Sequence, residues 1–377
     1  GKNNQNDNFE NIYKLEVLIT GIENNRISNF EKFFNLVKEN IYLIEQKLNY
    51  TFKEIILILE NFNPTFINLT GYKILNGSQI LRENITYILN TLKSYVDKIE
   101  SKKTILHIFN SKFNLDNSKI ENLPIGLFGD FYSHELSFTL INTNDFKNLN
   151  NIFNKCNLKI KKILLKSFIK GVYISDNNAN IDTFFQIEIN DVNSKIFYFE
   201  NNALKFQQDF KFGKEIIIKD ISKVTFLKKD TIEEILHKQE FNEKISDDEF
   251  IEEEFFKDDN YKKIKKKLIY EVARARINEI SELILFKNVN LKYYNKSLKP
   301  VFLELNCKLQ LKGFEELYKN IFSMNGNLQF KFLNNLSSES TLSTANRLVH
   351  YGWKKEAIPT TETKKSLIGK LFEAIFS

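Results

Sequence analysis

The chain has 377 residues, of which 42% are apolar and 14% aromatic, which is enough for two or more domains with sizeable cores. Its net charge of +6 comes from 54 basic and 48 acidic residues that are interspersed, which argues against nucleic acid as a partner. Cys156 and Cys307 lie far apart, and the four histidines show no repeated spacing, so we expect two reduced core thiols and no metal site. No apolar run is long enough to span a membrane, and no signal peptide opens the sequence.

The first half of the sequence alternates strand and helix patterns. The predicted strands are at 15–19, 51–62, 103–113 and 134–141. The predicted helices are at 27–48, 78–96 and 142–157, and residues 158–175 predict a strand that runs into a helix. Ser28 or Asn29 can cap the first helix, and Pro124, Gly126 and Gly129 mark a turn-rich loop.

The second half continues this alternation. Residues 184–206 alternate apolar and polar side chains with a break at 190–193, which predicts a β-hairpin. Two short helices are predicted within 214–238, and further elements at 267–286, 299–306, 312–322, 327–333 and 340–353. An acidic block at 246–259 and a basic block at 262–267 are expected to be a solvated loop and helix face. The order of elements predicts an α/β fold.

The last twelve residues, 366–377, carry a one-sided apolar pattern. Its apolar residues are Leu367, Ile368, Leu371, Phe372, Ile375 and Phe376, and they share one side of a helix. Lys364, Lys365 and Lys370 flank that side, which is typical of a helix lying in a membrane interface. Docking of this helix on its own domain is the alternative. One copy is expected to bind a membrane weakly, and an array of copies firmly.

Four stretches of the sequence resemble FtsA, the actin-like bacterial cell-division protein that tethers FtsZ filaments to the membrane. They are "GSQILRENITYIL", "KTILHIFNSKFNLDNSKIENLPIGLFGDFYSHELSFTLI", "STLSTANRLVHYGWKK" and the amphipathic last segment, in the family's order. The resemblance implies an actin-like two-lobed α/β fold of the actin, Hsp70 and sugar-kinase type, with an FtsA-type inserted α/β subdomain and a C-terminal amphipathic helix.

The resemblance also implies domain boundaries. The first lobe would take residues 1–69, 159–180 and 339–356, without its first strands, and the inserted subdomain 70–158. The second lobe would have a base at 181–212 and 289–338 and a tip at 213–288. A linker at 357–365 would precede the membrane-targeting helix at 366–377.

Partners follow from the same resemblance. The family polymerises, binds the FtsZ C-terminal tail on its second lobe, and recruits late division proteins through the insertion. The tail-binding arginine of the family matches Arg276, and Lys262, Lys263, Lys265 and Lys266 lie just upstream. We therefore expect a protein at the cytoplasmic face of the bacterial membrane, at the division site.

ATP and magnesium belong to the family, and their motifs are altered here. The phosphate-holding turn "DIGGGTTDI" aligns with Glu188, Asn190, Asp191, Val192, Asn193, Ser194 and Lys195. The adenosine-side Gly-Gly pair aligns with Asn306 and Cys307, and a family lysine with Leu236. The other phosphate hairpin would precede residue 14. Because glycine lets a backbone approach phosphates, we expect no catalytic residues, no ATPase activity, and weak or lost nucleotide binding. The alternatives are an ATP-binding FtsA whose first phosphate loop lies outside this sequence, and an actin-like scaffold similar to the pilus-assembly protein PilM.

Overall fold

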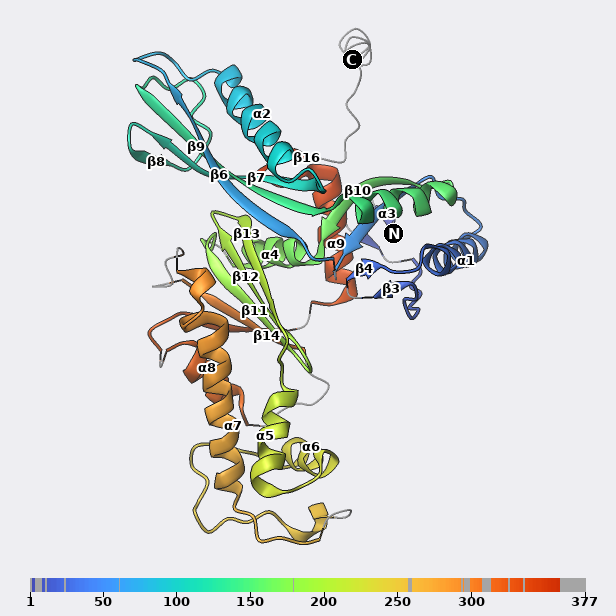
Figure 1. Ribbon diagram of the computed structural model, residues 1–377, viewed down its shortest axis with the longest axis vertical. Coiled ribbons are helices and arrows are strands. Elements are labelled where there is room, and N and C mark those ends of the chain that lie inside the picture. The colour runs from blue at the N-terminus through green and yellow to red at the C-terminus, as the bar shows by residue number, and fades with distance from the viewer. Residues whose placement is uncertain are drawn as a thin grey trace. The chain divides into compact units, whose positions relative to one another are not determined.

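A computed structural model describes residues 2–3, 9–10, 12–23, 25–60, 62–178, 180–256, 260–292, 294, 299–306, 313–324, 326–334 and 336–359. The chain forms two compact units. Unit 1 takes residues Gly1–Asn180, Glu200–Lys205 and Ser337–Ser377, and unit 2 takes Ile181–Phe199 and Phe206–Leu336. Strands and helices alternate through most of the described residues, which confirms the predicted α/β fold (Figure 1).

Unit 1 contains an antiparallel sheet in the order β16-β7-β9-β6, with β8 paired to β7. Its strands are β6 (Thr65–Ile74), β7 (Lys103–Leu115), β8 (Ser118–Ile120), β9 (Phe131–Asn142) and β16 (Glu356–Pro359). Helix α2 (Arg82–Ile99) lies along one face of this sheet (Figure 1). Its Ile88 and Val96 are buried against apolar strand residues such as Phe138, so its apolar stripe fixes it there.

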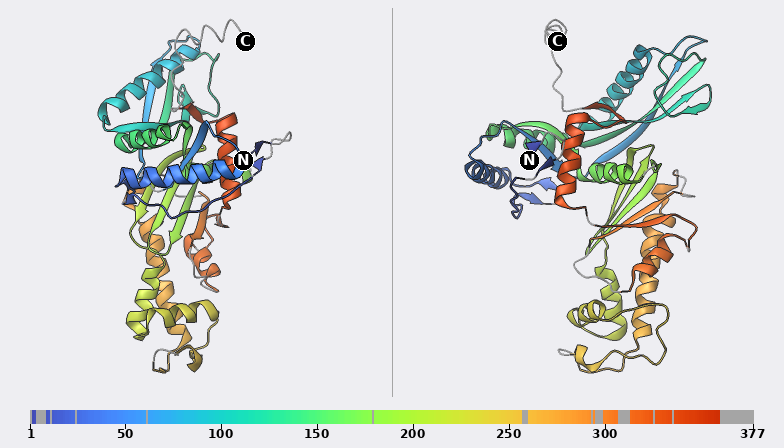
Figure 2. Two further views of the ribbon diagram at one scale, coloured as in Figure 1. Left: turned by 90° about the vertical axis from the view of Figure 1, so that its right-hand side faces the viewer. Right: turned by 180° about the vertical axis from the view of Figure 1, so that it is seen from behind.

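The rest of unit 1 is built on a parallel strand pair, β5 (Glu54–Leu59) and β10 (Lys159–Leu165). Its helices are α1 (Phe30–Leu48), α3 (Thr143–Lys155), α4 (Lys166–Asn177) and α9 (Ser338–Tyr351). Two short hairpins are formed by β1 (Lys2–Asn3) with β2 (Phe9–Glu10) and by β3 (Ile22–Glu23) with β4 (Arg26–Ile27). Asn29 caps α1, and α9 contacts α4 and β5 (Figure 2).

Unit 2 is built on a mixed sheet in the order β13-β12-β11-β14-β15. Its strands are β11 (Phe184–Asn190), β12 (Ser194–Glu200), β13 (Ala203–Phe210), β14 (Val301–Asn306) and β15 (Phe330–Leu333). Strand β12 runs antiparallel to β11, which confirms the predicted hairpin, and β14 runs parallel to both β11 and β15. The residues of β12 and β13 within Glu200–Lys205 belong to unit 1.

The helices of unit 2 are α5 (Glu215–Thr225), α6 (Lys229–Lys238), α7 (Lys266–Ser281) and α8 (Glu315–Phe322). Helix α7 continues into a π-helical turn, η2 (Glu282–Phe286), and two short 3₁₀ helices are η1 (Glu253–Phe256) and η3 (Val289–Leu291). Ile187, Ile189 and Leu303 face the core that these helices share. Since side chains alternate along a strand, Gln186, Glu188 and Glu304 lie on the opposite face of the sheet.

The structure departs from the expected elements and boundaries at three places. Residues 12–20 form no regular secondary structure, because none of the described strands pairs with them, and Leu18 is 90% exposed. The linker predicted at 357–365 begins inside β16, because the short run ending at Pro359 pairs with β7 as an edge strand, where proline is tolerated. Strand β6 also crosses the predicted boundary of the insertion at residue 70.

Several predicted features lie outside the described residues. These are the C-terminal helix, with Leu367, Ile368, Leu371, Phe372, Ile375, Phe376, Lys364, Lys365 and Lys370, together with Cys307. In the part of the chain that the structure describes, no helix is both long and apolar enough to cross a bilayer.

Candidate functional site

The turn between β11 and β12 occupies the position that the sequence assigned to a phosphate-holding turn. The Asn190 amide donates to the Asn193 carbonyl at 2.9 Å, and Asn190 Nδ2 donates to Asn193 Oδ1 at 2.6 Å. Helix α5 begins beside this turn. The Lys214 and Glu215 amides donate to the carbonyls of Asn190 and Asp191, at 3.0 and 2.9 Å. The turn therefore presents carbonyl oxygens to the start of a helix.

These contacts use the amides that would bind an anion. A helix N-terminus attracts phosphate through its first unpaired N–H groups. In α5, the next two amides also have partners, since Ile216 donates to the Gly213 carbonyl and Ile217 to the Lys214 carbonyl. No first-turn amide of α5 is left over for a ligand.

The Lys214 side chain neutralises the turn from inside. Its Nζ lies 2.9 Å from Asp191 Oδ1, and the lysine side chain is only 3% exposed. Ser194 Oγ adds a hydrogen bond to the Phe212 carbonyl at 2.8 Å. The chain itself thus supplies the cation and the donors at this position. A triphosphate does not fit these residues, because it would meet backbone carbonyls and the Asp191 carboxylate.

The remaining residues predicted at the nucleotide position divide between the two faces of the sheet. Glu188 is buried, lies opposite Lys195 on β12, and accepts a hydrogen bond from Gln186 Nε2 at 3.1 Å. It is in register with Glu304 on β14, and Asn190 is in register with Asn306. Leu236 on α6 is instead fully buried in the core behind the sheet. Val192 is 58% exposed at the turn.

Sequence reasoning missed Glu304, Gly213 and Lys214 at this place. Register brings Glu304 beside Glu188, but the two are more than a hundred residues apart in the chain. Gly213 and Lys214 precede a predicted helix, and the glycine at that point is a sequence signal that could have indicated a close backbone approach. Among the described residues, no group of three or more His, Cys, Asp or Glu side chains is placed to hold a metal ion.

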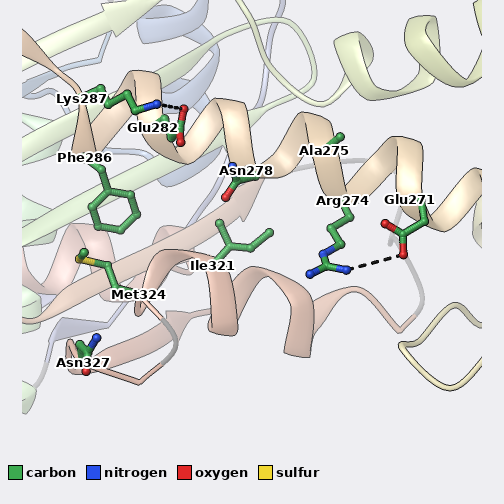
Figure 3. A pocket seen from close by; sticks show the side chains of 10 residues that line it. All are labelled: Glu271, Arg274, Ala275, Asn278, Glu282, Phe286, Lys287, Ile321, Met324 and Asn327. Carbon is green, nitrogen blue, oxygen red and sulfur yellow. Dashed lines mark hydrogen bonds and ion pairs between the residues drawn. The ribbon is translucent and has the colours of Figure 1, made fainter.

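A second candidate site is a groove between α7 and α8, with a cavity of about 720 Å³ (Figure 3). Its apolar lining consists of Ala275, Phe286, Ile321 and Met324, and Asn278 and Asn327 add amides. Two ion pairs lie along its α7 side, Arg274–Glu271 at 3.6 Å and Lys287–Glu282 at 2.7 Å.

The backbone around the groove departs from regular geometry at two points. Glu282 and Phe286 line it from the π-helical turn η2, and such turns occur often at functional sites. Met324 has a φ of 50° in the left-handed region, which is uncommon for a residue with a side chain. Because irregular backbone of this kind clusters at functional sites, the groove is the better candidate for a binding surface in unit 2.

Arg276, predicted to bind a partner's tail, points elsewhere. Its guanidinium pairs with Asp220 of α5 and with Glu279 of its own helix. Arg274, which the sequence analysis did not select, lies in the groove instead. Arg274 and Arg276 are two positions apart on α7, which corresponds to a rotation of about 200° around the helix axis. The two arginines therefore face opposite sides of α7.

The predicted basic run lies at the start of α7 and makes local contacts. Lys262 Nζ donates to the Phe226 carbonyl at 3.0 Å, and Lys263 lies over the Phe250 ring. Lys265 is the N-cap of α7, and Lys266 lies 3.8 Å from Glu249 of the acidic block. The charges of the two blocks are thus partly paired. The acidic block also buries the side chains of Ile251, Phe255 and Phe256, so it is more than the solvated loop that we expected.

Unit 1 carries an ion cluster around the buried Lys205 side chain that no sequence pattern indicated. Lys205 pairs with both Glu135 and Glu200, and Lys112 lies 3.0 Å from Glu200. Burial alone raises the pKa of Glu200, but its hydrogen bonds and charge interactions with Lys205 and Lys112 outweigh this and lower that pKa. Trp353 Nε1 also donates to the Asn202 carbonyl at 3.0 Å. This hydrogen bond and the ion cluster together hold residues Glu200–Lys205 in unit 1.

A second buried cluster fixes β16. Glu356 accepts a hydrogen bond from Lys162 Nζ at 2.7 Å and lies 3.2 Å from His107 Nδ1. Burial alone raises the pKa of Glu356, but the hydrogen bond with His107 and the charges of His107 and Lys162 outweigh it, so the pKa lies below its ordinary value. Strand β16 is therefore held to β7 by a buried ionised carboxylate.

Comparisons with known proteins find similar chains among solved structures only. No family model matches the chain. No curated protein matches it either. Solved structures do: a PilM–PilN type IV pilus biogenesis complex has a TM-score of 0.49 at 11% identity, covering 87% of this chain and 88% of that one. Spiroplasma citri MreB5 bound to ADP has a TM-score of 0.40 at 10% identity, over 88% and 78%.

A Bacteroides thetaiotaomicron protein described as having an actin-like ATPase fold and unknown function has a TM-score of 0.36 at 12% identity, over 90% and 88% of the two chains. The structures similar to this chain thus include proteins with an actin-like ATPase fold.

Proposed function

We propose that the chain is an actin-like scaffold that does not hydrolyse ATP and that tethers a filament protein to a membrane, as FtsA does. The observation that carries this is the filled turn of unit 2. Gly213 and Lys214 occupy the place where the resemblance implies a triphosphate, and the first amides of α5 are bonded to the turn. A lobe closed in this way keeps its shape without a nucleotide.

The α7–α8 groove is the proposed site for the FtsZ C-terminal tail. Its apolar floor suits the apolar side chains of an amphipathic peptide, and its amides suit the peptide backbone. An acidic residue of the tail would compete with Glu271 for Arg274, whose side chain is 53% exposed. We assign this contact to Arg274 because Arg276 is engaged by Asp220.

The remaining partners are proposed from the sequence. Residues 364–376 would lie on the inner face of the cytoplasmic membrane at the division site. Copies of the chain would assemble into filaments, so that weak single contacts with lipid add up. The insertion would receive late division proteins, and nucleic acid is not a partner.

One sedimentation experiment tests this function. The full chain, the Arg274→Glu variant and a chain ending at Lys365 are each mixed with anionic vesicles and a fluorescent FtsZ tail peptide. The full chain should pellet with vesicles and carry the peptide down. Arg274→Glu should still pellet but bind the peptide about tenfold more weakly, as expected for loss of one charged contact. The shortened chain should stay in solution together with the peptide while the vesicles pellet.

Two outcomes would contradict the proposal separately. Equal pelleting of the full and shortened chains would refute the tether and favour a PilM-like scaffold. Unchanged peptide affinity of Arg274→Glu would remove the groove as the site. Arg276→Gln is the matched control, because it removes an arginine from the opposite side of α7 and should leave peptide affinity unchanged.

A further inference from the structure

The segment at 12–19 of unit 1 exposes most of its large apolar side chains, although the sequence predicts a strand at 15–19. Leu18 is 90% exposed and Ile19 is 65% exposed. The other exposed apolar side chains of the segment are Ile12, Tyr13, Leu15 and Val17. Neighbouring exposed apolar residues on this scale mark an interaction surface rather than ordinary solvent-facing positions.

The backbone of this segment has no partner in the described part of the chain. No backbone hydrogen bond joins residues 12–20 to any other described residue, and every one of these residues is exposed. A row of unpaired N–H and C=O groups beside apolar side chains invites pairing with a strand of another chain. The segment thus has the groups that a strand needs, but no second strand beside it.

One end of the segment is fixed to the start of α1. The Ser28 and Asn29 amides donate to the Gly21 carbonyl at 2.9 and 3.1 Å. Further along, Lys14 Nζ lies 2.5 Å from Glu16 Oε1. Side chains at positions i and i+2 lie on the same side in a strand, so this contact shows that the backbone at 14–16 already has a strand-like course. Pairing would therefore order a segment that is held at one end.

The charges of the segment fit a second copy of itself in one register. When two antiparallel copies are centred on Leu15, position 14 of each copy lies opposite position 16 of the other. Lys14 then faces Glu16 of the other copy on both sides of the centre. Centring the pair on Lys14 or on Glu16 would instead set two like charges opposite each other, which is unfavourable.

The apolar side chains fit the same register. Position 13 lies opposite position 17, which pairs aromatic Tyr13 with β-branched Val17 on the face that also carries Leu15. Position 12 lies opposite position 18, so Ile12 faces Leu18 on the face that carries the charges. Both faces of the pair are thus complementary over residues 12–18.

We propose that residues 12–18 of two copies of the chain pair as an antiparallel ribbon centred on Leu15. The contact is two-fold symmetric, so it joins two copies and does not by itself extend a filament. A ribbon this short gives a weak contact, which becomes effective where copies are concentrated. The pairing requires neither a nucleotide nor a membrane, so it stands apart from the proposed function.

Disulfide trapping in the full chain tests the register. Leu15→Cys and Val17→Cys are each made together with Cys156→Ser and Cys307→Ser. The two Leu15 positions lie directly opposite each other, within reach of a disulfide, whereas the two Val17 positions lie about 14 Å apart. Leu15→Cys should therefore link two chains at least about tenfold faster. Val17→Cys is the matched control, because Leu15 and Val17 are 39% and 45% exposed. Equal rates, or faster linking at Val17, would overturn the proposal.

Charge reversal tests the contact between Lys14 and Glu16 of the two copies. In the Leu15→Cys chain, Lys14→Glu or Glu16→Lys alone sets like charges opposite each other and should slow the linking several-fold. An equimolar mixture of these two variants should recover the rate and give mainly the mixed dimer, identified by mass spectrometry. The mixture restores opposite charges between chains but not within either chain, so the pair within one chain does not explain the recovery. A mixture that links no faster than its components would overturn the proposal. Because no vesicles are present, failure of the membrane function leaves these outcomes unchanged.

Discussion

Gly213 is the residue on which the closed turn depends. A Cβ atom at this position would lie 2.3 Å from the Asn190 carbonyl oxygen and 2.7 Å from the Asp191 carbonyl oxygen. Both oxygens are backbone atoms that accept hydrogen bonds from the start of α5, so neither can move without loss of those bonds. Only glycine allows the two chain segments to approach this closely.

We therefore expect Gly213→Ala to lower the free energy of unfolding by roughly 2–4 kcal/mol, in the range of overpacked positions. Urea unfolding followed by circular dichroism measures this. Gly326→Ala is the control, because Gly326 has a φ of 91° but nothing within 4 Å of a Cβ, so only backbone strain is added. Its cost should be about 1 kcal/mol. Equal costs for the two variants would show that the turn is not closed around Gly213.

At the level of elements, local patterns predicted those strands and helices whose periodicity is complete. The hairpin at 184–206 and the helix α2 formed where apolar side chains recur at a single period. Strand β6 was missed because Asn68 and Gly71 interrupt its pattern, and β16 because it is short and ends in Pro359. The apolar run at 15–19 has strand character, but a strand also requires a paired neighbour, which local pattern does not report.

Strand β9 carries a buried histidine that makes unit 1 sensitive to acid. His134 is fully buried, its Nε2 lies 2.9 Å from Asn110 Oδ1, and burial lowers its pKa to about 4. The unfolded chain takes up a proton near pH 6.5, and the folded chain does so only near pH 4. Stability is therefore fully present above pH 6.5 and is lost as the pH falls from 6.5 toward 4, by roughly 3 kcal/mol in all.

Urea unfolding at intervals between pH 7 and pH 4 measures this loss. His134→Gln removes the titrating group, so the part of the loss between pH 6.5 and 4 that belongs to His134 should disappear. His350→Gln is the control, because His350 is exposed on α9 and should leave the profile unchanged. If His134→Gln has the same profile as the unmodified chain, the histidine is not buried in solution.

For the whole molecule, the alternation of elements predicted the α/β class, but long-range polar clusters could not be predicted. His107 and Glu356 are separated by 249 residues, and Lys205 and Glu135 by 70. No local pattern brings such residues together, because strand order and register decide which side chains meet. The same holds for the candidate site. The absence of glycine at 190–192 was visible in the sequence, whereas the closing of the turn by Lys214 required the structure.

The closed turn leads to a prediction for the full chain with nucleotide. A ligand at 100 times its dissociation constant stabilises a protein by about 2.7 kcal/mol, which raises the melting temperature by several degrees in a chain of this size. Because the amides and the cation at the turn are already used, 1 mM Mg-ATP should shift the melting temperature by less than about 1 °C, the same as magnesium alone. Differential scanning fluorimetry over a range of ATP concentrations measures the shift.

Lys214→Ala should melt at a lower temperature, since it leaves Asp191 without its cation, and it should be equally insensitive to ATP. A shift that saturates with ATP and exceeds several degrees would mean that the turn opens to admit a nucleotide, and the scaffold would then be a nucleotide-dependent one.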